Sequence, residues 1–347
     1  MNNINDLIGD HLFQLNLVLW LTQPLPQGFA IRPIFKESGY LVHSISQPLA
    51  LPIPIREKIR GKNINVQDGC SPDVILEKSQ KNSFLLVECK KQSFGTNSTT
   101  SEQARTLLLL KGRALSEALG LALDTIVENK IVYLTRADQK SQLNDTCKSM
   151  VTELENVGFT VCPTYCLGIK CDSTNSIYLV IDSNDTNELG LLEHGEIKVI
   201  EGQPETDPRP LYFIPLDPSV EQNEYGIKTL EQRLLSEILS LIGRAKISSK
   251  IQFDCEELLE KATWGMYGIW GDRNARLNLK RKVKTFLSEK MVSLLPNNFQ
   301  KEQDKLILSL NSSQDKETIL SSFQKTKEIE VLKAPLQFKL FEKNENS

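Results

Sequence analysis

The stretch that decides the fold is residues 72–91, PDVILEKSQKNSFLLVECKK. Residues 73–78 and 84–91 are two strand-like runs rich in large apolar side chains, and the polar segment between them is short enough for a turn. We therefore expect an antiparallel hairpin. Its register would place Asp73, at the start of the first strand, beside Glu88 near the end of the second.

Alternation along the second strand puts Glu88 and Lys90 on one face of the sheet, because successive side chains point to opposite sides. Together with Asp73 they would gather two carboxylates and one ammonium group. Two convergent carboxylates suit Mg²⁺, which keeps coordination sites for water and a substrate phosphate, and a lysine beside them can orient the attacking water. The pattern predicts a metal-dependent phosphodiesterase site, and the alternative is an exposed strand end with a salt bridge.

The acid-x-base triplet alone carries no information. With 44 acidic and 41 basic residues in 347 positions, chance gives about five such triplets. The sequence Glu196-Ile197-Lys198 is another example in a strand-like run, but no Pro-Asp strand precedes it. The hypothesis therefore depends on the whole combination in residues 72–90.

Working outward from the hairpin, hydrophobic periodicity predicts alternating helices and strands in the first 200 residues. This order indicates a mixed α/β or α+β domain around one central sheet. The expected elements are a helix over 5–21 with Asn5 as N-cap, a strand over 39–46, a helix over 101–123, a strand over 130–136, a helix over 139–157 and two strands within 159–182.

Pro72, Asp73, Glu88 and Lys90 together resemble the motif of the PD-(D/E)XK nuclease superfamily. The resemblance implies a restriction-endonuclease-like fold, a central mixed sheet flanked by helices whose core runs helix, three strands, helix, strand. It also implies that Asp73 and Glu88 ligate Mg²⁺, with Mn²⁺ as a substitute. The backbone carbonyl of Cys89 would add a ligand, and Lys90 would serve the attacking water.

Two further site residues follow from the same resemblance. Gln103 is similar to the helix-borne glutamine that many members place beside the metal, although it also fits the third position of a capping box begun by Thr100. Members often carry another acid on the first helix, for which Asp10 is the candidate and Glu37 the reserve. The alternative for Asp10 is a solvated position at the helix edge.

Five prolines between residues 204 and 218 predict a linker over 201–220. It would join a nuclease-like domain, residues 1–200, to a mainly helical, winged-helix-like domain, residues 221–340. In the latter, Thr229 with Gln232 resembles a capping box, Gly243 fits a C-terminal cap, and Asp254 with Glu257 begins a second helix.

A third helix is expected from Asp272, and basic residues follow it at helical spacing. It is similar to the third helix of a helix-turn-helix or winged-helix unit, which indicates DNA binding, whereas the alternative is a solvated basic face. The candidate DNA-binding residues are Arg273, Arg276, Lys280, Arg281, Lys282 and Lys284.

Composition and short motifs limit the classes of protein to which the chain could belong. A net charge of −3 means that DNA binding needs a local basic surface, and the apolar runs are too short or too interrupted to span a bilayer. No secretory signal is recognised, so we expect a cytoplasmic protein. Seven scattered cysteines suggest reduced thiols, and three histidines that form no zinc motif are expected to be structural.

The sequence thus favours a metal-dependent nuclease that cleaves DNA, with restriction and antiviral defence as the expected process and repair or recombination next. The alternative is a non-catalytic DNA-binding or assembly module that retains the fold. Any ATPase or recognition subunit would be a separate partner, because no nucleotide-binding GxxxxGK[ST] motif occurs. A homodimer is expected for cleavage of both strands.

Overall fold

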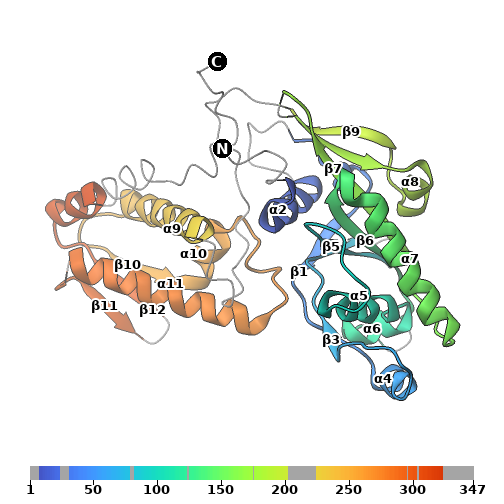
Figure 1. The fold of residues 1–347 in the computed structure, drawn as a ribbon. Helices are drawn as coiled ribbons and strands as arrows, with labels where there is room; N and C mark the ends of the chain where they lie inside the picture. Colours follow the sequence, from blue (N-terminus) through green and yellow to red (C-terminus); the bar gives the residue numbers. More distant parts are fainter. Residues whose placement is uncertain are drawn as a thin grey trace. The chain divides into compact units, whose positions relative to one another are not determined.

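The computed structural model describes residues 8–23, 31–78, 82–122, 125–174, 176–201, 224–294, 296–302 and 305–322 (Figure 1). The chain divides into two compact units, and the first contains every described residue up to Glu201 while the second contains those from Glu224 onward. Apart from Glu201, the predicted linker over 201–220 lies outside the described residues. Each unit is described by itself.

The first unit is built on a seven-stranded mixed sheet, which confirms the expected mixed α/β class (Figure 1). β5–β6 and β6–β7 are parallel pairs, and the other neighbouring pairs are antiparallel. In spatial order the strands are β1 (Leu41–Ile45), β4 (Val74–Lys78), β5 (Ser83–Cys89), β6 (Glu128–Arg136), β7 (Thr164–Cys171), β8 (Ile177–Ile181) and β9 (Gly195–Ile200).

The predicted hairpin is confirmed as β4 and β5, with Val74 opposite Val87 and Lys78 opposite Ser83. Asn82, just before β5, has a φ of 45°, a left-handed conformation that asparagine adopts more readily than most residues. Every residue of β5 is buried. A strand that is buried on both faces is typically a continuous apolar run, and here that run is residues 84–87, FLLV.

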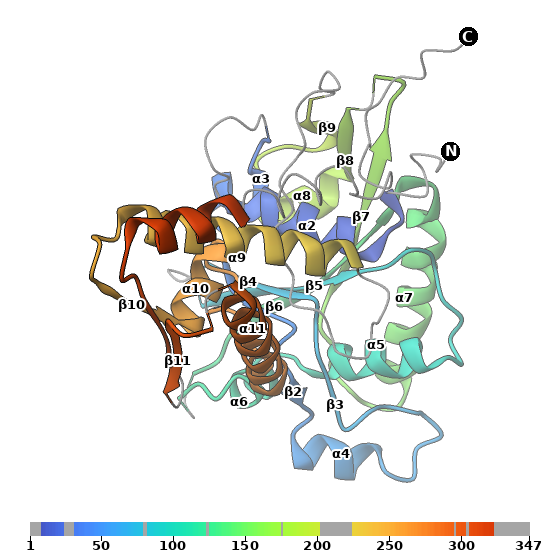
Figure 2. The same cartoon turned by 90° about the vertical axis from the view of Figure 1, so that its left-hand side faces the viewer.

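Helices cover both faces of this sheet, with α2 (His11–Thr22) on one side and α5 (Thr99–Leu109) on the other (Figures 1 and 2). The α5 side holds a large apolar core with α6 (Arg113–Ala118) and α7 (Lys140–Asn156). Smaller elements are α3 (Ile34–Glu37), β2 (Leu49–Ala50), α4 (Ile53–Ile59), β3 (Gly69–Cys70), η2 (Ala137–Gln139) and α8 (Ser183–Leu189).

Three sequence predictions for this unit need correction. The helix expected over 5–21 is interrupted at Gly9 and Asp10: Ile8 is helical, and α2 begins anew at His11, where the Asp10 side chain accepts a hydrogen bond from the Phe13 N–H. Asn5 lies outside the described residues. The helix expected over 101–123 is two helices, interrupted at Gly112 with a φ of 56°. α4 was missed because Pro52 and Pro54 suggested a break, yet proline is compatible with the first turn of a helix.

The second unit combines helices with a three-stranded antiparallel sheet of order β10-β12-β11. Apolar side chains from all of these elements form one core. In chain order the elements are α9 (Glu224–Arg244), β10 (Lys250–Asp254), α10 (Cys255–Ala262), α11 (Arg273–Leu294), β11 (Phe299–Glu302), β12 (Lys305–Ser309) and a helical segment over 313–322.

The helix caps in this unit are partly as predicted. Asp254 caps α10 by accepting hydrogen bonds from the Glu256 and Glu257 N–H groups, which confirms that prediction. The Thr229 capping box is wrong because α9 already begins at Glu224, and Gly243 lies inside its last turn. Residues 224–228 contain no proline, so nothing in them stops the helix from beginning before Thr229. Among the described residues, no helix is long and apolar enough to cross a membrane.

Candidate functional site

Asp73 directly precedes β4, and the β4–β5 register continued by one residue places it opposite Glu88. Its Oδ2 accepts a hydrogen bond of 2.6 Å from the Cys89 N–H, and its Oδ1 lies 3.4 Å from His11 Nε2. The carboxylate is therefore held between the end of β5 and the start of α2.

Glu88 occupies the centre of the site and is only 1% exposed. Its Oε2 accepts a hydrogen bond of 2.7 Å from Lys90 Nζ, and its Oε1 accepts one of 3.3 Å from Gln103 Nε2. The structure thus brings together Asp73, Glu88, Lys90 and Gln103, from the ends of two strands and the first turns of α5.

The capping-box interpretation of Gln103 is wrong. The N-cap of α5 is Ser98, whose side chain accepts from the Ser101 N–H while the Ser101 hydroxyl bonds back to Ser98. Thr100 lies within the first turn of α5. Gln103 is free of that local role and points to Glu88.

Burial and charge set the protonation of this cluster. Burial, with the charge of Asp73 added, raises the pKa of Glu88 to about 7, although Lys90 acts in the opposite direction. Burial also works against the charge of Asp73, but its hydrogen bond with His11 and the neighbouring positive charges hold its pKa below the usual range. Burial opposes the Lys90 charge too, yet the carboxylates of Glu88 and Asp73 raise its pKa.

Two residues of α2 belong to the site although the sequence did not single them out. His11, expected to be structural, has its pKa raised to about 9 by the hydrogen bond and the charge of Asp73. Gln14 is fully buried, and its Nε2 donates to the carbonyls of Ile8 at 2.9 Å and Lys90 at 3.3 Å. The available signal was a pair of polar side chains three residues apart in a mostly apolar helix, since such pairs share a face.

The candidate acids outside the hairpin have other partners. The Asp10 carboxylate caps α2 at the Phe13 N–H, at 2.9 Å, and His11 is the α2 residue that reaches Asp73. Glu37 pairs with Arg32 at 3.2 Å. A metal-binding role for Asp10 therefore stays a prediction, with the cap as its observed role.

The donor set at Asp73 and Glu88 fits a cation that needs few protein ligands. Among the described residues, no group of three or more His, Cys, Asp and Glu side chains could hold a metal ion. Two carboxylates suit Mg²⁺, which retains several waters and accepts phosphate oxygens. A buried glutamate whose pKa is raised beside a second carboxylate also fits, because a divalent cation would offset the cost of burying its charge.

In the second unit, α11 buries Ala275, Val283, Leu287 and Met291. Of the six predicted DNA-binding residues on this helix, Arg273, Arg281 and Lys282 are exposed. Arg276, Lys280 and Lys284 are half-buried, and Lys280 Nζ pairs with Glu256 Oε1 at 2.9 Å.

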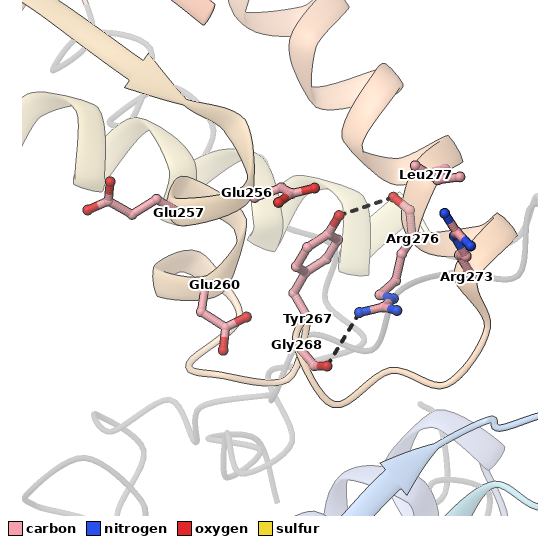
Figure 3. A pocket seen from close by; sticks show the side chains of 8 residues that line it. All are labelled: Glu256, Glu257, Glu260, Tyr267, Gly268, Arg273, Arg276 and Leu277. Atoms are coloured by element: carbon pink, nitrogen blue, oxygen red, sulfur yellow. Dashed lines mark hydrogen bonds between the residues drawn. The ribbon is translucent and has the colours of Figure 1, made fainter. Parts of the chain in front are cut away.

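A cavity of about 510 Å³ lies between α10 and the start of α11 (Figure 3). Arg276 donates to the Gly268 carbonyl at 3.5 Å, and the Tyr267 hydroxyl donates to the Arg276 carbonyl at 3.5 Å. Carboxylates on the α10 side of the cavity reduce the positive potential of its two arginines. The lining residues are Glu256, Glu257, Glu260, Tyr267, Gly268, Arg273, Arg276 and Leu277.

The chain was compared with protein-family models, with curated proteins and with solved structures, and none of them matches it. The interpretation of the site therefore depends on its own geometry and chemistry.

Proposed function

We propose that the first unit is a metal-dependent nuclease whose active site is formed by Asp73, Glu88 and Lys90. The observation that carries the proposal is the burial of Glu88 between Asp73 and Lys90 at the paired ends of β4 and β5. A buried carboxylate is costly unless it has cationic partners, and sites with strongly shifted pKa values are often functional.

Each residue would have a distinct task in hydrolysis. Asp73 and Glu88 would hold Mg²⁺, which when bound supplies polarisation of the phosphodiester and a water of lowered pKa. Lys90, oriented by Glu88 Oε2, would position the attacking water or stabilise charge on the phosphate. Gln103 would orient Glu88 through Oε1, and the side chain of His11, 57% exposed, lies where a substrate phosphate could meet it.

The order of elements supports a restriction-endonuclease-like fold for this unit. α2 precedes the antiparallel β1, β4 and β5, and α5 then leads to β6, parallel to β5. This is the helix, three strands, helix, strand order that the PD-(D/E)XK resemblance implies. The proximity of Asp73 and Glu88 at the paired ends of β4 and β5 supports their proposed role as metal ligands.

We propose that the second unit binds DNA. Its order of helix, strand, two helices and hairpin, with β12 between β10 and β11, supports a winged-helix-like fold. In such a unit the helix before the hairpin enters the major groove, and here that helix is α11. The exposed Arg281 and Lys282 are the strongest candidates for phosphate contacts, because Arg273 lines a cavity that also contains three glutamates.

The proposed substrate is DNA, and restriction of foreign DNA is the proposed process. A separate ATPase or recognition subunit, and a second copy of the chain, would be the partners of such an enzyme. The competing hypothesis is the non-catalytic module, which would use the same strand and helix order of the second unit for DNA binding or assembly.

Cleavage assays test the proposal directly. Supercoiled plasmid, linear duplex, single-stranded DNA and RNA would be incubated with wild type, Asp73→Asn and Glu196→Gln in Mg²⁺, Mn²⁺ or EDTA. We expect metal-dependent cleavage of DNA by wild type and Glu196→Gln and none by Asp73→Asn. Equal cleavage by Asp73→Asn would overturn the assigned site, and DNA binding without cleavage by any variant would favour the module.

A further inference from the structure

Lys90 lies one residue beyond the end of β5, where the regular strand pairing stops. Its N–H still donates to the Leu134 carbonyl of β6 at 2.8 Å. Its carbonyl accepts a hydrogen bond of 3.3 Å from Nε2 of Gln14, a residue of α2. The backbone of Lys90 is thus held by β6 through its N–H and by α2 through its carbonyl.

Stability alone gives a poor explanation for Gln14. The side chain is fully buried on a helix of mostly apolar residues, and its Oε1 has no hydrogen-bond partner among the described residues. An unpaired buried acceptor destabilises a protein. The amide nitrogen donates to two carbonyls, that of Ile8 just before α2 at 2.9 Å and that of Lys90 at 3.3 Å. The bond to Lys90 is the one that joins α2 to the hairpin.

The same helix face touches both strands of the site. His11 and Gln14, three positions apart on α2, lie on one face; His11 reaches Asp73 and Gln14 reaches Lys90. α2 therefore contacts the hairpin at the start of β4 and at the end of β5. Small displacements of a reacting group lower the rate steeply, so a clamp at Lys90 would have a functional effect.

We infer that Gln14 is a positioning residue, which fixes the Lys90 backbone so that its ammonium group stays on Glu88. The inference rests on the proposed nuclease function for its catalytic consequence, but the placement of Lys90 can be measured without activity. Gln14→Met keeps a side chain of similar length and removes the amide. Thr22→Val is the matched control, because Thr22 is a buried polar residue of α2 that bonds the Val18 carbonyl in its own helix.

The first measurement is the rate of acetylation of Lys90 by acetic anhydride, followed by mass spectrometry with exposed Lys91 as the internal reference. We expect Lys90 labelling, relative to Lys91, to rise about fivefold in Gln14→Met, the factor expected for one lost hydrogen bond. Thr22→Val should leave the ratio unchanged. An unchanged ratio in Gln14→Met would overturn the inference, whatever the enzyme does.

The second measurement is metal-dependent cleavage by the same variants. Gln14→Met should lower kcat about tenfold with little change in KM for DNA, and it should cost nothing further in a Lys90→Met background, since both changes act through one group. A full additional loss in that background would contradict the positioning role. If Lys90 labelling rises but wild type cleaves nothing, the nuclease proposal fails while the placement of Lys90 by Gln14 stands.

Discussion

Two strands of the first unit carry the same Glu-x-Lys pattern and place it in opposite environments. At the end of the central strand β5, the side chains of Glu88 and of Lys90, one residue beyond the strand, are 2% and 18% exposed and pair with each other. On β9, at the end of the strand order, the side chains of Glu196 and Lys198 are 56% and 42% exposed. There Glu196 pairs with Lys170, and Lys198 pairs with Glu201.

The comparison shows that burial, rather than the Glu-x-Lys pattern itself, distinguishes a candidate functional pair from an ordinary surface ion pair. Exposed ion pairs contribute about 0–1 kcal/mol and need no special explanation. A buried pair loses more on desolvation and is weak evidence for stability, so its presence points to another use. On β9, Glu196 and Lys198 therefore supply the matched controls for Glu88 and Lys90.

The largest effect that separates the two strands is expected in metal binding. Asp73→Asn should weaken Mn²⁺ binding about a thousandfold, ~4 kcal/mol, since losing even an outer-shell partner of a ligand costs 10–100-fold. Glu196→Gln should bind Mn²⁺ as wild type does. Electron paramagnetic resonance titration measures both, and equal affinities in the two variants would remove the metal from the candidate site.

The next effect is a pH dependence of stability. Because the pKa of Glu88 rises from about 4.5 in the unfolded chain to about 7 in the fold, the unfolded state loses this proton first, and the folded state loses stability as pH rises from about 4.5 to 7. Glu88→Gln should therefore gain on wild type over this window by up to about 3 kcal/mol.

Urea unfolding at pH 5 and pH 8 measures that gain. Glu196→Gln is the comparison, and its difference from wild type should stay within about 0.5 kcal/mol at both pH values, as for most surface substitutions. If the difference in unfolding free energy between Glu88→Gln and wild type were also the same at both pH values, Glu88 would not be a buried, proton-binding group.

The smallest effects concern the exposed basic side chains. Arg281→Ala and Lys282→Ala should each weaken DNA binding by about 1 kcal/mol at low salt and each reduce the slope of log affinity against log salt by about 0.9. Lys198→Ala removes the same charge from β9 and should change neither quantity. Fluorescence anisotropy over a salt series would detect the difference, and three equal slopes would remove α11 from the DNA interface.

The hairpin and its carboxylates could be predicted because the information is local. Pro72-Asp73, a short polar turn and the apolar run before Glu88 fix both strands and their register. Lys90 then follows from alternation along the strand. Gln103 was ambiguous, because its local pattern also fitted a capping box until the structure placed the cap at Ser98.

The contribution of α2 could not be predicted, because it depends on how a distant helix packs. Gln14 and Lys90 are 76 positions apart in the chain, and nothing in the local pattern of either residue indicates the other. His11 was set aside because a lone histidine matches no metal motif, although its contact is with a carboxylate. Sequence patterns thus predicted which groups the hairpin supplies but not which groups hold them in place.

The central claim is that the buried Glu-x-Lys of β5 belongs to an active site and the exposed one of β9 does not. The most direct test is the rate of Mg²⁺-dependent cleavage of DNA by wild type, Lys90→Met and Lys198→Met, each at the same protein concentration and with an EDTA control. The account predicts a loss of about a thousandfold, ~4 kcal/mol in activation free energy, for Lys90→Met and an unchanged rate for Lys198→Met. Equal rates for Lys90→Met and Lys198→Met would contradict it.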